Sequence, residues 1–94
     1  MPQNVIQVQR SVNDEWLVTI NANSRTEHVV HLSKADLDQV GYGHSAEEVL
    51  RESFRFLLER EPNTSILSSF SLPMIGRYFP EYQQEMRRRL SGSK

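Results

Sequence analysis

Residues 45–61 have the sequence SAEEVLRESFRFLLERE, and we expect the fold to form around this segment. Ser45 and Glu48 have the spacing of a capping box, which predicts that a helix begins after Ser45. Between Ala46 and Leu58 the apolar side chains share one arc of roughly 200° at about 100° per residue, with charged side chains opposite. So wide an arc predicts cover on two sides, by a sheet and by later helices. Pro62 closes the helix, because the residue before a proline is disfavoured in helical conformation.

The sequence before this helix alternates between apolar and polar residues, which is typical of half-buried strands. A first predicted strand carries three apolar side chains on one face: Ile6, Val8 and Val12. Asn13 and Asp14 supply a turn, a second strand is expected over 15–21, and a third over about 26–32. Such short connections favour an antiparallel meander, because parallel neighbours need crossovers of about a dozen residues.

The remaining segments are predicted to be helical. Ser33 and Asp36 resemble a capping box for a short helix, with Gly41 as the residue after its end. After Pro62 we expect short turns and, last, a helix over 81–90. The predicted fold is therefore α+β, with a three-stranded antiparallel meander, a long central helix and shorter C-terminal helices in two layers. We expect neither a parallel pair among these three strands nor any strand beyond residue 46.

Length and composition indicate one ordinary globular domain. The 94 residues are 37% hydrophobic and 24% charged, and they allow a single core over residues 1–90 with a frayed end at 91–94. The absence of cysteine excludes disulfides, thiolate metal sites and cysteine nucleophiles. With no signal-peptide pattern and no long apolar run, we expect a cytoplasmic protein without a membrane partner.

The motifs that suggest chemistry are weak. His28 and His31 are three residues apart on a predicted strand, so their side chains should point to opposite faces and cannot share a metal ion. His44 is adjacent to Ser45, but the serine already serves as a helix cap. We therefore expect no catalytic, cofactor-binding or metal-binding residue. A small enzyme would need a pocket that collects His44, Arg77 or Tyr42 together.

An uncharged segment, 62–76, is the first candidate functional surface. Its apolar and aromatic side chains, with those just after it, form a candidate protein-interaction surface: Phe70, Leu72, Met74, Ile75, Tyr78, Phe79 and Tyr82. The partner would be another protein or a second copy of the chain. The alternative is that these side chains form a second layer packed on the long helix.

The second candidate is a basic cluster near the C-terminus. Residues 77–94 carry five basic and two acidic groups, although the whole chain has a net charge of −1. Four arginines are candidate anion or nucleic-acid ligands: Arg77, Arg87, Arg88 and Arg89. The alternative is that the last three complement the negative end of a helix and aid solubility.

The C-terminal half is similar to a group of short bacterial proteins, cyanobacterial members among them, that share residues 53–62 (SFRFLLEREP), 65–67 (SIL) and 78–82 (YFPEY). The group carries no assigned activity, so the resemblance implies no site residue. A looser similarity is to ribbon–helix–helix antitoxins, whose order of strand, helix, turn and helix is followed from Thr26 to Glu61. That similarity implies DNA binding, although the predicted ribbon presents Glu27, Val29 and His31 instead of basic and amide side chains.

Overall fold

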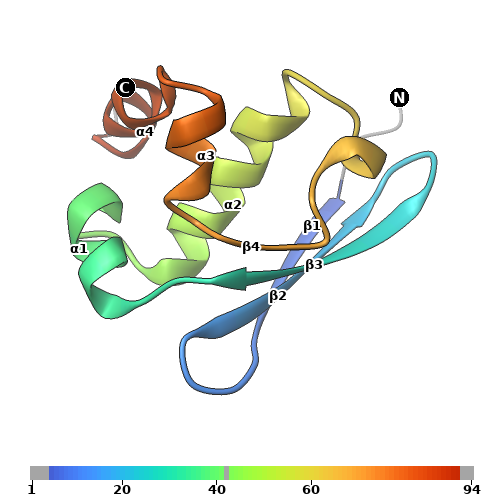
Figure 1. The fold of residues 1–94 in the computed structure, drawn as a ribbon, viewed down its shortest axis with the longest axis horizontal. Helices are drawn as coiled ribbons and strands as arrows, with labels where there is room; N and C mark the ends of the chain where they lie inside the picture. Colours follow the sequence, from blue (N-terminus) through green and yellow to red (C-terminus); the bar gives the residue numbers. More distant parts are fainter. Residues whose placement is uncertain (1–4, 42, 92–94) are drawn as a thin grey trace.

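The computed structural model describes residues 5–41 and 43–91, and these form a four-stranded sheet with helices on one face (Figure 1). The first three strands are β1 (Val5–Arg10), β2 (Glu15–Asn21) and β3 (Arg25–His31). They pair in chain order and antiparallel, as predicted, but they belong to a four-stranded sheet and not to a sheet of three strands. Its helix-facing side carries Val18, His28 and Val30, all of them buried.

A fourth strand, β4 (Ser69–Ser71), lies beside β3 and runs parallel to it. The prediction of no strand beyond residue 46 is therefore wrong, and β4 adds a parallel pair to the sheet, although the three predicted strands pair antiparallel with one another. The connection from β3 to β4 contains two helices, which is the crossover that a parallel pair requires. Phe70 aligns with Val30, and both side chains are buried. A run of three residues is too short for an alternating pattern to predict a strand. β4 is a strand only because it pairs with β3.

The first strand is shorter than predicted, and the turn after it begins earlier. β1 ends at Arg10, and Val12 lies in the turn with 64% of its surface exposed, so its predicted place on the inner face is wrong. Asn13 has a φ of 54°, a conformation that asparagine adopts more readily than most residues. Asn13 and Asp14 supply the turn as predicted.

The described helices lie on one side of the sheet and are, in chain order, α1 (Lys34–Gly41), α2 (Ala46–Leu58), α3 (Met74–Tyr78) and α4 (Tyr82–Leu90), with a 3₁₀ turn, η1 (Asn63–Ser65), after α2. α2 and α3 pack against strands, and α4 packs against the other helices. The capping box of α2 is present, since Ser45 accepts from the Glu48 amide and the Glu48 side chain accepts from the Ser45 amide. Gly41 is still helical, so its predicted role after the helix end is wrong. Gly43, two residues later, has a positive φ of 88°.

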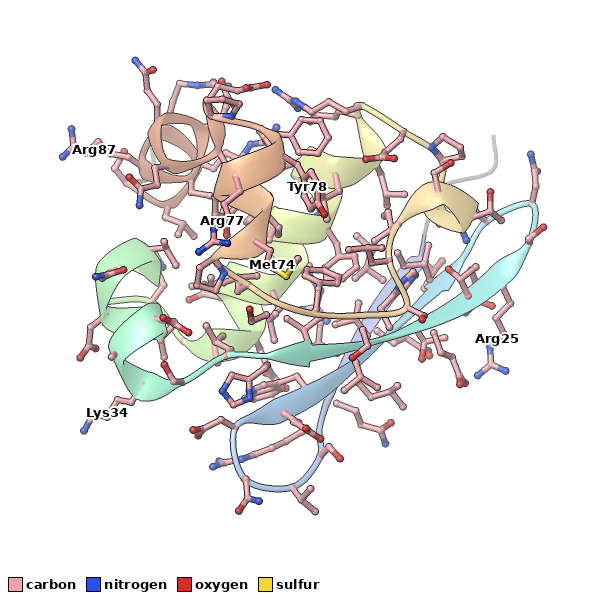
Figure 2. All side chains as sticks on the ribbon, in the orientation of Figure 1. Arg25, Lys34, Met74, Arg77, Tyr78 and Arg87 are labelled. Atoms are coloured by element: carbon pink, nitrogen blue, oxygen red, sulfur yellow. The ribbon has the colours of Figure 1, made fainter. Side chains whose placement is uncertain are left out.

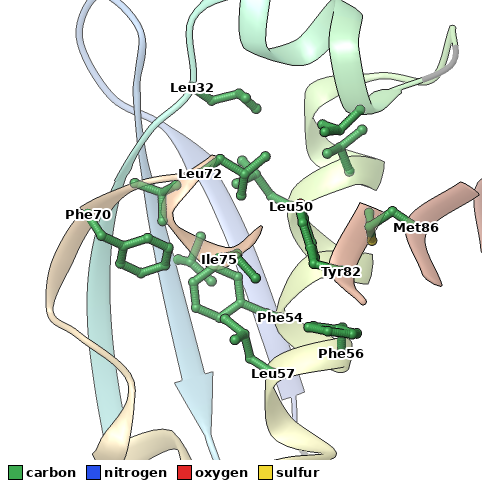
Figure 3. Packing of buried hydrophobic residues seen from close by; sticks show 14 of the residues in the cluster. Leu32, Leu50, Phe54, Phe56, Leu57, Phe70, Leu72, Ile75, Tyr82 and Met86 are labelled. Carbon is green, nitrogen blue, oxygen red and sulfur yellow. The ribbon is translucent and has the colours of Figure 1, made fainter. Parts of the chain in front are cut away.

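Helix α2 is covered on two sides, as its wide apolar arc predicts. Toward the sheet, the Phe54 ring lies 5.5 Å from the His28 ring and 6.0 Å from the Phe70 ring, centroid to centroid. Toward the C-terminal helices, the Phe56 ring lies 5.4 Å from that of Tyr82. Figure 3 shows the rings of Phe54, Phe56, Phe70 and Tyr82 in one continuous core. The described residues thus share one core, while residues 1–4, 42 and 92–94, including most of the predicted frayed end, lie outside them.

Candidate functional site: an apolar groove between α2 and α3

A groove of about 380 Å³ opens between the end of α2, the segment from η1 to β4, and α3. Its floor consists of Leu57, Phe70 and Ile75, which also belong to the core and are at most 8% exposed. Ile66 and Leu67 form one wall, and Leu67 is 47% exposed. We call this feature the α2–α3 groove. It is a place where core side chains are reached from solvent.

The opposite wall comes from α3. Met74 and Tyr78 are one turn apart on this helix and line the groove, with Phe79 directly after them. Figure 2 shows Met74 and Tyr78 on the side of α3 that faces η1, and Arg77 on the side toward α1. Tyr78 is 62% exposed, so its ring lies at the rim and is free to contact a partner.

The predicted interaction surface is divided by the structure. Four of its members are buried in the core: Phe70, Leu72, Ile75 and Tyr82. For these four the alternative of a second packed layer applies, because their side chains belong to the same core cluster as the buried face of α2. Met74 and Phe79 are half-buried, and Tyr78 is exposed. Only these last three, with Leu67 and Ile66 from the other wall, remain accessible.

A buried hydrogen-bond network holds the wall formed by Ile66 and Leu67 in place. The carbonyl of Leu67 can only accept, so His28 Nδ1 donates to it at 2.7 Å, and Nε2 of the same ring is hydrogen-bonded to the Thr26 hydroxyl at 2.9 Å. Asn63 donates to the same Thr26 oxygen at 2.8 Å and to the Ser24 carbonyl at 3.0 Å. His28 and Asn63 are 1% and 5% exposed. The network fixes the groove wall to the first half of β3 and to the turn before it.

The groove contains one charged side chain, Glu61, which the sequence analysis did not single out. It lies just after the carboxyl end of α2 and is half-buried. Its carboxylate has no hydrogen bond or ion pair with another described residue. The neighbouring Arg60 is engaged elsewhere, because it pairs with Glu81 at 3.0 Å and lies 3.7 Å from the centre of the Phe56 ring.

The basic cluster is partly neutralised within the chain. Arg89 crosses from α4 to α2 and binds both carboxylate oxygens of Glu59 at 2.7 Å. Its hydrogen bond lowers the pKa of the Glu59 carboxyl below the ordinary value. Arg88 pairs with Glu85 at 2.6 Å within α4. Arg77 and Arg87 are exposed, and Arg77 lies on α3, away from the other three. The four arginines do not form one site.

The weaker candidates stay apart. His28 is buried and His31 is exposed, so the two rings point to opposite faces as predicted. His44 pairs with Glu48 at 3.1 Å beside the helix cap. The pocket that contains Arg77 is lined by Asp36 and Gln39 of α1, without His44, and Tyr42 lies outside the described residues. Among residues 5–41 and 43–91, no group of three or more histidines and carboxylates is placed to hold a metal ion.

Comparison with known proteins assigns nothing further: no family model, curated protein or solved structure matches this chain. Within the described part of the chain, every helix is too short or too polar to span a bilayer. The function must therefore be inferred from the groove itself.

Proposed function

We propose that this protein is a non-enzymatic interaction protein of the cytoplasm, which docks a segment of another protein in the α2–α3 groove. The observation that carries the proposal is the exposure of Leu67 and Tyr78 on the two rims of a groove whose floor is the core. A bulky side chain inserted there would bury apolar surface on both partners, at roughly 25 cal/mol per Å². Central, well-packed pockets of this kind supply most of the affinity in protein interfaces.

Nucleic-acid binding through the basic cluster has less support. Arg88 and Arg89 form ion pairs with Glu85 and Glu59, and these pairs lower the positive potential that would attract a phosphate backbone. β3, the strand that would form the ribbon of an antitoxin-like dimer, already pairs with β2 and β4. β2 occupies one edge of β3 over its full length, and β4 occupies the other edge over Val29–His31, which leaves only a short free edge for a second copy.

Panning a library of short random peptides against the immobilised protein tests the docking proposal. A double variant, Leu67→Ser with Tyr78→Ser, should lose the enriched peptides, because both substitutions remove apolar surface from the rims. Val12→Ser is the matched control, since Val12 is 64% exposed in the β1–β2 turn. Peptides that bind the double variant as well as they bind the wild type would contradict the proposal. Sedimentation over a concentration series detects the other outcome, in which a second copy occupies the groove.

A further inference from the structure

We infer that the segment docked in the α2–α3 groove carries a lysine or arginine next to its apolar anchor, and that this cation pairs with Glu61. The inference rests on the proposed function and names the chemistry of the partner. It starts from a contrast within the groove: the other lining side chains are apolar or uncharged, and Glu61 is the single charged one.

Glu61 is the one charged residue that lines the groove, and no described residue supplies a positive charge to its carboxylate. Glu59 and Glu81 each pair with an arginine, whereas the Glu61 side chain has no hydrogen bond or ion pair with another described residue. It is nevertheless half-buried beside Leu57 and Ile66. An occupied groove would remove water from this carboxylate, which is costly unless the partner supplies a positive charge.

The backbone around Glu61 adds to this preference for a cation. α2 ends at Leu58, so the negative end of its dipole lies just before Glu61. The nearest basic side chain along the chain, Arg60, donates to the Phe56 carbonyl at 3.1 Å and to Glu81. It is thus held away from the groove by contacts of its own. The field at this end of the groove favours a positive side chain and disfavours an acidic one.

The apolar anchor and the cation would be close together on the partner. Tyr78 and Leu67 mark the rims and Phe70 the floor, while Glu61 lines the groove with Leu57, one helical turn earlier in the chain. A bulky apolar side chain on the floor therefore leaves a neighbouring lysine or arginine within reach of the carboxylate. An acyl chain or another neutral ligand would bury Glu61 without satisfying it.

Parallel panning of wild type and Glu61→Lys with the same short-peptide library tests the inference. The wild type should enrich peptides with a large apolar residue near a lysine or arginine. Peptides enriched on Glu61→Lys should have the same apolar residue, with a neutral or acidic residue in place of the lysine or arginine. Glu15→Lys, on the exposed outer face of the sheet, changes the net charge equally and should select as the wild type does.

Binding of one selected peptide gives the quantitative result. Glu61→Gln should weaken it about three- to tenfold at low salt, and high salt should remove most of the difference. Denaturant melts check that both Glu61 variants fold. If wild type and Glu61→Lys enrich the same peptides and the Leu67→Ser, Tyr78→Ser variant loses them, docking stands and the cation inference is overturned. If no enriched peptide depends on the groove, both fail.

Discussion

At the scale of single residues, we expect Phe54 to contribute strongly to the stability of the core. It is fully buried on α2 and contacts rings from β3 and β4. Phe54→Ala should cost about 3–5 kcal/mol, because the removed ring leaves a cavity between layers that cannot fully close. Arg55→Ala, one residue along on the exposed face, should cost under about 0.5 kcal/mol. Equal, small losses in denaturant melts would contradict the assignment of the core face.

Tyr82 is the second residue with a measurable signature. Its hydroxyl lies 2.7 Å from the Ser53 hydroxyl inside the core, and burial raises the pKa of the phenol to about 12. Between pH 10, the ordinary value, and about 12 the unfolded chain loses this proton before the folded chain does, so stability falls as pH rises. The slope should be about 1.4 kcal/mol per pH unit.

Tyr82→Phe should remove that alkaline slope and cost about 1–2 kcal/mol at neutral pH, since Ser53 loses its phenol partner. Urea melts at a series of alkaline pH values measure both effects. An unchanged slope in the variant would show that the phenol ionises as freely in the folded chain as in the unfolded one.

At the scale of elements, the docking of α4 onto α2 combines burial with ion pairs. Tyr82, Met86 and Leu90 occupy one face of α4 and are buried, as their four-residue spacing predicts. Arg89 adds an inter-helix pair, and its side chain is only 15% exposed, whereas that of Arg88 is 70% exposed and pairs within α4. The same residue type therefore has two different roles one position apart.

Arg89→Ala should destabilise the protein by about 1–2 kcal/mol, because it removes the charge-assisted hydrogen bonds from Nη2 to both Glu59 oxygens and uncovers part of α2. Arg88→Ala should cost less than about 0.5 kcal/mol, as exposed pairs within a helix do. Thermal melts of both variants at equal salt give the comparison. A larger loss for Arg88→Ala would mean that α4 is not held through Arg89.

At the scale of the whole molecule, acid stability follows from the glutamates. The pKa values of Glu48, Glu59, Glu81 and Glu85 lie below the ordinary 4.5, chiefly through hydrogen bonds from His44, from Arg89, from the backbone and from Arg88 respectively. Their stabilisation is present above 4.5 and is lost as the pH falls through the lower folded-state values, because the unfolded chain binds protons first.

We therefore expect unfolding free energies to decline from about pH 5 toward about pH 2, and to decline less steeply in high salt, which screens exposed pairs. Chemical denaturation across this range at two salt concentrations measures the effect. An acid decline that salt leaves unchanged would assign it to buried groups instead of these surface pairs.

Much of this architecture is encoded locally. Alternation predicts β2 over 15–21, and the capping box together with the apolar arc predicts where α2 begins and which face it buries. These patterns work because side chains on one strand or helix face repeat at fixed intervals, whatever the rest of the chain does. The apolar spacing of α4 works for the same reason.

Only the tertiary structure decided the remainder. β4 exists because Phe70 is seated beside Val30, and the four buried members of the predicted surface became core because α2 lies over them. Glu61 became a candidate binding residue only because α2, η1 and α3 meet around it and the neighbouring Arg60 pairs with Glu81. Local sequence sets which face of an element is apolar. Whether that face meets another element or solvent depends on contacts between residues far apart in the chain, which no local pattern records.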